Sequence, residues 1–238
     1  DTVYSLEFDD AGALWIGTNG GGINRFSRRR VYRVRFRHDP ERSHSLSNGK
    51  VTAIHPPSRG TVWIGTYNGL SRFDLETGSF TNYGAGEEGL ANSVVIAVES
   101  DENGRVWIGT MRGLDRLDQA TGRVDHIDIP GGVVRDLTID SAGTLWIGSY
   151  EGLFRLTPTP STSEIPVPEA VDIELPSKAV MVIREEEPGV LQLGCWDGGV
   201  VTYELDTGRA GTRRLGDNRI YAMTKTVDGI LWVATWGG

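Results

Sequence analysis

A Trp-centred phrase of five residues recurs along the 238-residue chain and constrains its fold more than any other feature. Its six copies, the fifth of them degenerate, are LWIGT (14–18), VWIGT (62–66), VWIGT (106–110), LWIGS (145–149), LQLGC (191–195) and LWVAT (231–235). The central positions are 48, 44, 39, 46 and 40 residues apart. A phrase that returns at this period indicates a repeat architecture, and about 40–45 residues is the length of one four-stranded propeller blade.

The first repeat shows the strand pattern that the others follow. Its β-branched and aromatic runs, separated by polar turns, predict four strands at 2–8, 13–18, 23–26 and 31–36. We therefore predict an all-β propeller of four-stranded antiparallel blades in meander order, with five complete repeats and half of a sixth. Residues 1–238 form one partial propeller, and its approximate blades are 1–46, 47–91, 92–131, 132–176, 177–216 and the incomplete 217–238.

The repeated Trp and the glycine two residues after it have structural interpretations. Six equivalent positions cannot all form one ligand site, so we expect the Trp side chains to fill the space between neighbouring blades. The five tryptophans are Trp15, Trp63, Trp107, Trp146 and Trp232, and Gln192 stands in the degenerate copy. Glycine is unfavourable inside a strand, so Gly17 and its equivalents predict a bulge or a close backbone approach.

Composition narrows the possible functions. The net charge of −8 argues against a nucleic-acid surface, so we expect no nucleic-acid partner. The single cysteine, Cys195, excludes an internal disulfide and a cysteine-based metal site. Four histidines lack metal-ligand spacing, so we expect neither metal nor cofactor. No apolar run approaches the roughly 18 residues of a membrane helix. The chain begins on a strand and ends inside a repeat, so we interpret it as a piece of a longer protein.

The positions just after each phrase are candidates for ligand contact. In a meander blade these turns emerge on one face of the disc, together with the joins that enter the first strands. Aromatic and charged residues vary there, and such side chains stack on sugars and bond their hydroxyls. The candidates are Asn19, Tyr67, Asn68, Met111, Arg112, Tyr150, Glu151, Trp196, Asp197 and Trp236, with Arg135 and Arg219 from the joins. The alternative is that these turn positions vary because nothing constrains them.

Basic residues of the joins and turns suggest an acidic ligand. Lys50, Arg135, Lys178 and Arg219 are expected near this face, where they and Arg112 could meet an acidic oligosaccharide. Pairing with Asp136, Glu151, Asp197 and Asp217 is an equally good explanation. Arg33, Arg35 and Arg37 share one face of a strand and, with 28–30, could form a basic docking patch. A solvated edge strand protected by charge is the alternative.

One segment interrupts the repeat pattern. TPTPSTSEIPVPEA (157–170) is rich in Pro, Ser and Thr, and we interpret it as a mobile excursion inserted into the fourth blade. The fourth strand of that blade is expected near 171–175.

The phrases LWIGTNGGGINRF, VWIGTYNGLSRFD and VWIGTMRGLDRLD resemble the two-component regulator propeller repeat. That repeat builds the periplasmic sensor region of bacterial membrane receptors, including hybrid histidine kinases and receptors with diguanylate cyclase outputs. The resemblance implies a periplasmic ligand-sensing module that does no chemistry itself. It also implies a fragment of a seven-bladed propeller. The partners implied are the remaining blades, a membrane helix, an output domain, a small-molecule or oligosaccharide ligand and, in a homodimer, a second copy.

Two other classes of function stay open. A propeller lyase or glycoside hydrolase acting on polysaccharide would need two carboxylates about 5–10 Å apart across the scissile bond. Glu151, Asp197, Asp217 and Asp136 are the acids on the expected ligand face. A scaffold for protein–protein contacts is the third class, because a fold alone does not fix function.

Overall fold

The computed structural model describes residues 2–9, 11–27, 33–58, 60–157, 164–225 and 229–237. Within these ranges the chain forms 22 β-strands, in five four-stranded sheets and one two-stranded sheet, and no helix. The described part therefore contains no helix with the length and hydropathy needed to cross a membrane. In every sheet the strands pair in chain order, which confirms the predicted all-β propeller blades. The chain divides into two compact units, 1–126 and 127–238.

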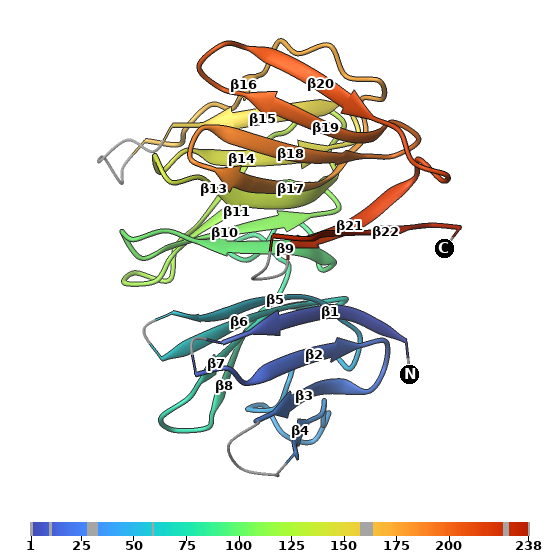
Figure 1. Cartoon of the computed structure of the whole chain (residues 1–238). Helices are drawn as coiled ribbons and strands as arrows, with labels where there is room; N and C mark the ends of the chain where they lie inside the picture. Colours follow the sequence, from blue (N-terminus) through green and yellow to red (C-terminus); the bar gives the residue numbers. More distant parts are fainter. Residues whose placement is uncertain are drawn as a thin grey trace. The chain divides into compact units, whose positions relative to one another are not determined.

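The first unit contains three blades, coloured from blue to green in Figure 1. Each is an antiparallel meander whose second strand carries the Trp phrase. The strands are β1 (Val3–Phe8), β2 (Leu14–Thr18), β3 (Gly22–Phe26) and β4 (Arg33–Phe36); β5 (Val51–Ser58), β6 (Thr61–Thr66), β7 (Gly69–Asp74) and β8 (Phe80–Tyr83); β9 (Val95–Ser100), β10 (Arg105–Thr110), β11 (Gly113–Asp118) and β12 (Val124–Ile127).

The second unit contains two further four-stranded blades and one pair of strands, and its last strands are red in Figure 1. The strands are β13 (Val134–Ile139), β14 (Leu145–Ser149), β15 (Gly152–Leu156) and β16 (Glu169–Ala170); β17 (Val180–Glu187), β18 (Val190–Cys195), β19 (Gly199–Glu204) and β20 (Arg209–Arg213); β21 (Ile220–Lys225) and β22 (Leu231–Thr235).

The tryptophans of the phrase pack between successive blades. Trp15 on β2 is fully buried in a cluster with Ile64 and Phe73 of the next blade. Trp63 on β6 is buried in the same way beside Ile108, and Trp146 on β14 packs in a cluster with residues of β18. The Trp of one blade therefore fills the space against the blade that follows it.

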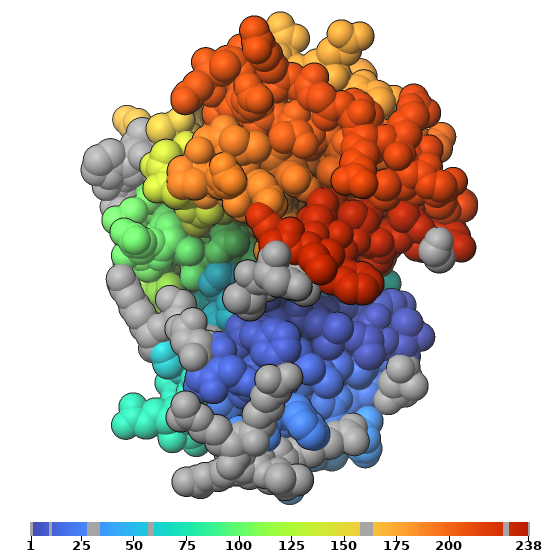
Figure 2. Space-filling model, in the orientation of Figure 1, coloured from blue at the N-terminus to red at the C-terminus, as the bar shows by residue number. Residues whose placement is uncertain are grey.

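Trp232 departs from this pattern and corrects the expected packing role for that position. Its side chain is 61% exposed, although β22 has the same phrase as the other second strands. The physical reason is that each buried Trp packs against the following blade, and among the described residues no strand follows β22. Figure 2 shows β21 and β22 in red at the surface of the second unit.

The glycine two residues after the Trp, which Ala234 replaces in the last copy, produces both the bulge and the close approach that the sequence predicts. The β1–β2 register shifts between Val3 and Ser5, which places a bulge opposite Gly17. A Cβ on Gly17 would also lie 2.6 Å from Cγ1 of Val51 in the next blade. Glycine therefore lets successive blades approach closely at the inner strands.

The Pro-rich segment gives a shorter outer strand than expected. β16 consists of only Glu169 and Ala170, which pair with Arg155 and Phe154. The stretch expected as a strand, 171–175, is not one, although Val171 and Ile173 still pack partly buried against the core. Pro166 and Pro168 lack backbone N–H donors, which limits the ladder before β16, and after β16 the N–H of Val171 still donates to the carbonyl of Leu153 at 3.0 Å. Of the inserted excursion, 158–163 lie outside the described residues, as do the arginines at 28–30.

Candidate functional site

The turns that follow the Trp phrase lie beside the joins that enter the first strands. The backbone N–H of Tyr67 donates to the carbonyl of Lys50 at 3.1 Å, and that of Trp196 donates to Ala179 at 2.8 Å. The N–H of Gly69 also donates to the carbonyl of Ser93, which enters the next blade. Within each unit, the turns and joins therefore form one continuous face, as the meander pattern predicts.

A hydroxyl from the last residue of the phrase fixes each of three turns. In the second blade, Oγ1 of Thr66 accepts from the N–H of Asn68 at 3.0 Å and donates to the carbonyl of Gly69 at 2.9 Å. Thr110 and Ser149 make the same pair of bonds in their blades. This role was not predicted, although Thr or Ser recurs at that position in five of the six copies of the phrase. These hydrogen bonds consequently preorganise the backbone of the three turns.

The candidate side chains on these turns are mostly open to solvent. Those that are exposed are Tyr67, Asn68, Met111, Arg112, Tyr150, Glu151, Asp197 and Trp236, and those that are half-buried are Asn19, Arg135, Trp196 and Arg219. Exposed aromatic rings on hydrogen-bonded turns are typical of surfaces that recognise ligands, because little conformational entropy is lost on binding.

A cation from the join, or from the first strand directly after it, lies over an exposed tyrosine in each unit. In the first unit, Nζ of Lys50 lies 5.1 Å from the ring centroid of Tyr67. In the second, the guanidinium carbon of Arg135 lies 5.7 Å from the centroid of Tyr150. Each pair combines an apolar ring with a hydrogen-bond donor at one point of the surface.

The second unit also gathers three aromatic side chains. The ring of Trp236 lies 5.6 Å from that of Trp196 and 6.1 Å from that of Tyr221, measured between centroids. Tyr221 was not among the predicted candidates, although its place just after the join was the available signal. Beside this group, Arg219 donates two hydrogen bonds to Asp217, at 2.7 and 3.0 Å. These bonds hold the pKa of the Asp217 carboxyl well below its usual range.

The acids of this face are largely engaged with partners. Oδ2 of Asp136 accepts the backbone N–H of Ile183 at 2.7 Å, and burial raises the pKa of Asp136 to about 7. Oε2 of Glu151 lies 3.9 Å from Nζ of Lys178, and both groups are exposed. Asp217 is ionised and paired with Arg219, which makes it a poor proton donor. These contacts fit a polar binding surface better than an acid–base pair.

A Ser–His–Glu arrangement occurs in the first unit, away from the candidate turns in sequence. Nε2 of His55 lies 2.8 Å from Oγ of Ser100, and Nδ1 lies 3.3 Å from a carboxylate oxygen of Glu99. Burial lowers the pKa of His55 to about 4, so the imidazole is too weak a base to activate a serine efficiently. We interpret the cluster as a structural link between β5 and β9.

Three segments of the chain, 89–112, 128–151 and 214–237, match the sequence model of a family described as "Two component regulator propeller". Each segment runs from a join to the turn after the Trp phrase, so the matched unit is the hairpin of the first two strands. The resemblance seen in the sequence is thereby confirmed. Over 70 residues, or 29% of this chain and 5% of the relative, the chain is 31% identical to histidine kinase P4 of Formosa agariphila.

Solved structures with 23% identity or less share the propeller fold. One is the extracellular domain of a protein assigned to the hybrid two-component systems of B. thetaiotaomicron. It has a TM-score of 0.83 at 23% identity, and the match covers 99% of this chain and 32% of that one. Virginiamycin B lyase from Staphylococcus aureus has a TM-score of 0.77 at 18% identity, and the match covers 99% of this chain and 78% of the lyase. The chain thus spans about a third of the two-component structure that it matches.

Proposed function

We propose that this chain, which carries two-component regulator propeller repeats, is the ligand-sensing module of a bacterial signalling receptor. The family description and the partial similarity to a histidine kinase support a role in signal transduction. In this proposal the module is periplasmic and belongs to an inner-membrane protein. Its remaining blades, membrane helix and kinase or cyclase output belong to the longer protein, and two copies of that protein can pair.

The observation that carries the binding function is the set of rigid turns bearing exposed aromatic rings. Hydroxyl groups hold the turns of Tyr67 and Tyr150, and a cation lies over each ring. The outer face of such a ring can stack on the apolar face of a sugar, while neighbouring Asn, Asp and Arg side chains bond its hydroxyls. We therefore infer that the ligand is an oligosaccharide.

Binding to this face would transmit a signal only by favouring one arrangement of the receptor over another. A ligand shifts such an equilibrium by no more than its difference in affinity for the two states. Contacts from turns of several blades provide that difference, because they depend on how the blades are arranged. The module itself binds and releases its ligand unchanged.

Titration calorimetry against a panel of oligosaccharides tests this proposal. We expect Tyr150→Ala to weaken binding of a responsive saccharide at least fivefold with little change in thermal stability. Trp107→Ala is the matched control, because its buried ring packs in the core and its loss lowers stability instead. Equal loss of stability in both variants, or no binding by any saccharide, would contradict the proposal. Chromatography of the titrated saccharide should return it intact, since cleavage would indicate an enzyme.

A further inference from the structure

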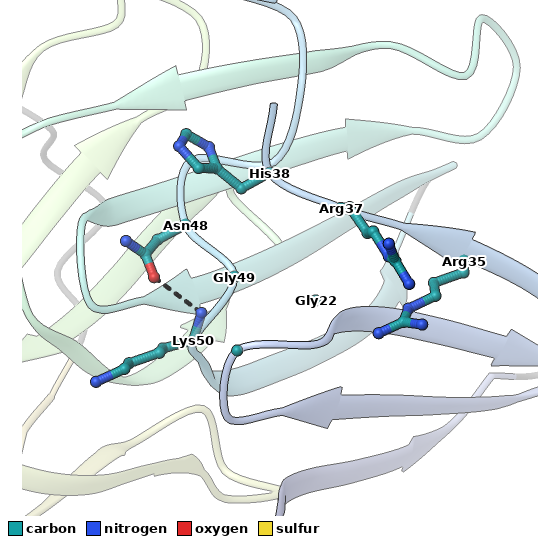
Figure 3. Close-up of a pocket in the computed structure, with 8 residues that line it drawn as sticks. Gly22, Arg35, Arg37, His38, Asn48, Gly49 and Lys50 are labelled. Atoms are coloured by element: carbon teal, nitrogen blue, oxygen red, sulfur yellow. Dashed lines mark hydrogen bonds between the residues drawn. The ribbon is translucent and has the colours of Figure 1, made fainter. Parts of the chain in front are cut away.

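A hollow of about 560 Å³ lies in the first unit where three segments meet (Figure 3). These are the β2–β3 turn, the end of β4 and the join that leads into β5. The lining residues are Gly20, Gly22, Arg35, Arg37, His38, Asn48, Gly49 and Lys50. The hollow thus borders the candidate face, because Lys50 also lies over the ring of Tyr67.

The lining is basic in a chain whose net charge is −8. Arg35, Arg37 and Lys50 line it together with His38, and no carboxylate is among the lining residues. In Figure 3 the guanidinium groups of Arg35, on β4, and Arg37, just after it, converge. Positive charges held close together repel one another, and a bound anion reduces that repulsion.

Contacts within the hollow fix several of these groups. Nε of Arg35 donates to the carbonyl of Gly21 at 3.0 Å, which orients the guanidinium. Nδ1 of His38 lies 2.7 Å from the carbonyl of Leu46, so Nδ1 carries the proton and Nε2 is the second polar atom of the ring. Among the described residues, Arg37 has neither a hydrogen bond nor an ion pair from its side chain. Its donors are therefore available to a ligand.

Glycines allow the three segments to approach closely enough to form the hollow. A Cβ on Gly22 would lie only 2.2 Å from the carbonyl oxygen of Phe36. Another on Gly49 would lie 3.0 Å from that of Gly20. The N–H groups of Gly20 and Gly22 both donate to the carbonyl of Gly49, at 2.9 and 3.0 Å. These two hydrogen bonds therefore fix the backbone that supports the basic side chains.

We propose that this hollow binds the oxyanion of an acidic oligosaccharide, a carboxylate or a sulfate ester, with Arg35 and Arg37 as its principal donors. Guanidinium groups match the geometry of such oxyanions and bind them through paired, charge-assisted hydrogen bonds. Tyr67 would stack on a neighbouring sugar ring, and Lys50 would lie between the ring and the anion. This inference rests on the proposed saccharide-binding function and names the chemical class of its ligand.

Calorimetric titration with four probes tests the inference: a uronic-acid trisaccharide, a sulfated trisaccharide, a neutral trisaccharide and inorganic sulfate. We expect at least one acidic trisaccharide to bind tenfold or more tightly than the neutral one. Arg37→Gln should weaken that binding at least fivefold, and Arg35→Gln with Arg37→Gln should abolish the preference for acidic sugars. Arg213→Gln is the matched control, because it removes one positive charge from an exposed position on β20, outside the hollow.

The outcomes separate this inference from the proposed function. Equal binding of neutral and acidic trisaccharides that is insensitive to Arg37→Gln would overturn the oxyanion site and keep saccharide binding. If inorganic sulfate binds as tightly as any saccharide and loses the same affinity in Arg37→Gln, the hollow binds a free anion. That result would overturn the acidic saccharide as its ligand. Binding of none of the four probes would overturn both. Thermal unfolding by circular dichroism confirms that each variant is folded before titration.

Discussion

The indole Nε1 of Trp146 donates a 2.7 Å hydrogen bond to Oδ2 of Asp140, six residues earlier in the chain. The other carboxylate oxygen accepts the backbone N–H groups of Ala142 and Thr144, at 3.0 and 2.8 Å. Asp9 joins the first turn to Trp15 in the same way. One aspartate therefore shapes the turn between the first two strands and satisfies the buried indole.

We predict that Asp140→Ala lowers the free energy of unfolding by about 2–4 kcal/mol. The change leaves a buried indole N–H and two turn N–H groups without their acceptor, and each such loss costs about 1–3 kcal/mol when buried. Urea denaturation followed by tryptophan fluorescence measures the change. Asp206→Ala, at an exposed turn position between β19 and β20, is the control and should stay within about 0.5 kcal/mol of the unchanged protein. Similar losses in both variants would refute the link to the indole.

The sequence predicted the blades well because their determinants are local and repeated. Period-two patterning, turn glycines and the Trp phrase all act within a few residues of one another, so six copies reinforce one interpretation. The bond from Asp140 to Trp146 was not predicted, because the sequence alone does not show which donors the two carboxylate oxygens accept. That assignment depends on how the strand places the indole over the turn.

The site was predicted less completely because it depends on contacts between segments. The turn positions and joins could be placed on one face from topology alone. The basic hollow needs the close approach of Gly22 to Phe36, and no sequence spacing predicts that approach. Tyr221 meets Trp236 because β21 and β22 pair, whereas the candidates predicted from the sequence were residues after the phrase and basic residues of the joins. The exposure of Trp232 likewise depends on a following blade rather than on its own phrase.

Truncation of Trp146 should cost much more stability than truncation of Trp232. Trp146→Ala removes a side chain that is 2% exposed and leaves a cavity, so we expect a loss of about 3–5 kcal/mol. Trp232→Ala removes one that is 61% exposed, and we expect a loss below about 1 kcal/mol. Chemical denaturation of the 238-residue chain compares them directly. A large loss for Trp232→Ala would show that its side chain is packed after all.

His55 should make the chain less stable in mild acid. Burial lowers the pKa of His55 from 6.5 to about 4, and Glu99 and Ser100 are its polar neighbours. The neutral ring therefore contributes stability that is fully present above pH 6.5 and is lost as the pH falls toward 4, by up to about 3 kcal/mol. We expect His55→Gln to lose less stability than the unchanged protein between pH 7 and 4.5, as measured by urea denaturation. The exposed His44→Gln is the control, and a pH profile for His55→Gln parallel to it would rule out the effect.

Asp136 should lower the stability of the chain as the pH rises, whereas His55 lowers it as the pH falls. Burial raises its pKa from 3.8 to about 7, although Ile183 donates to it and the charges of Arg184 and Arg135 oppose the shift. The folded state therefore favours the protonated carboxyl, and the stability that this contributes is present below pH 3.8 and is lost as the pH rises through about 7. The full difference is on the order of 4 kcal/mol. Asp136→Asn keeps an oxygen acceptor for Ile183 and cannot ionise. We expect this variant to match the unchanged protein near pH 4 and to exceed its unfolding free energy at pH 8, whereas Asp172→Asn, at an exposed position, should change neither. An Asp136→Asn variant that is no more stable at pH 8 would show that the carboxyl is ionised in the folded chain without penalty.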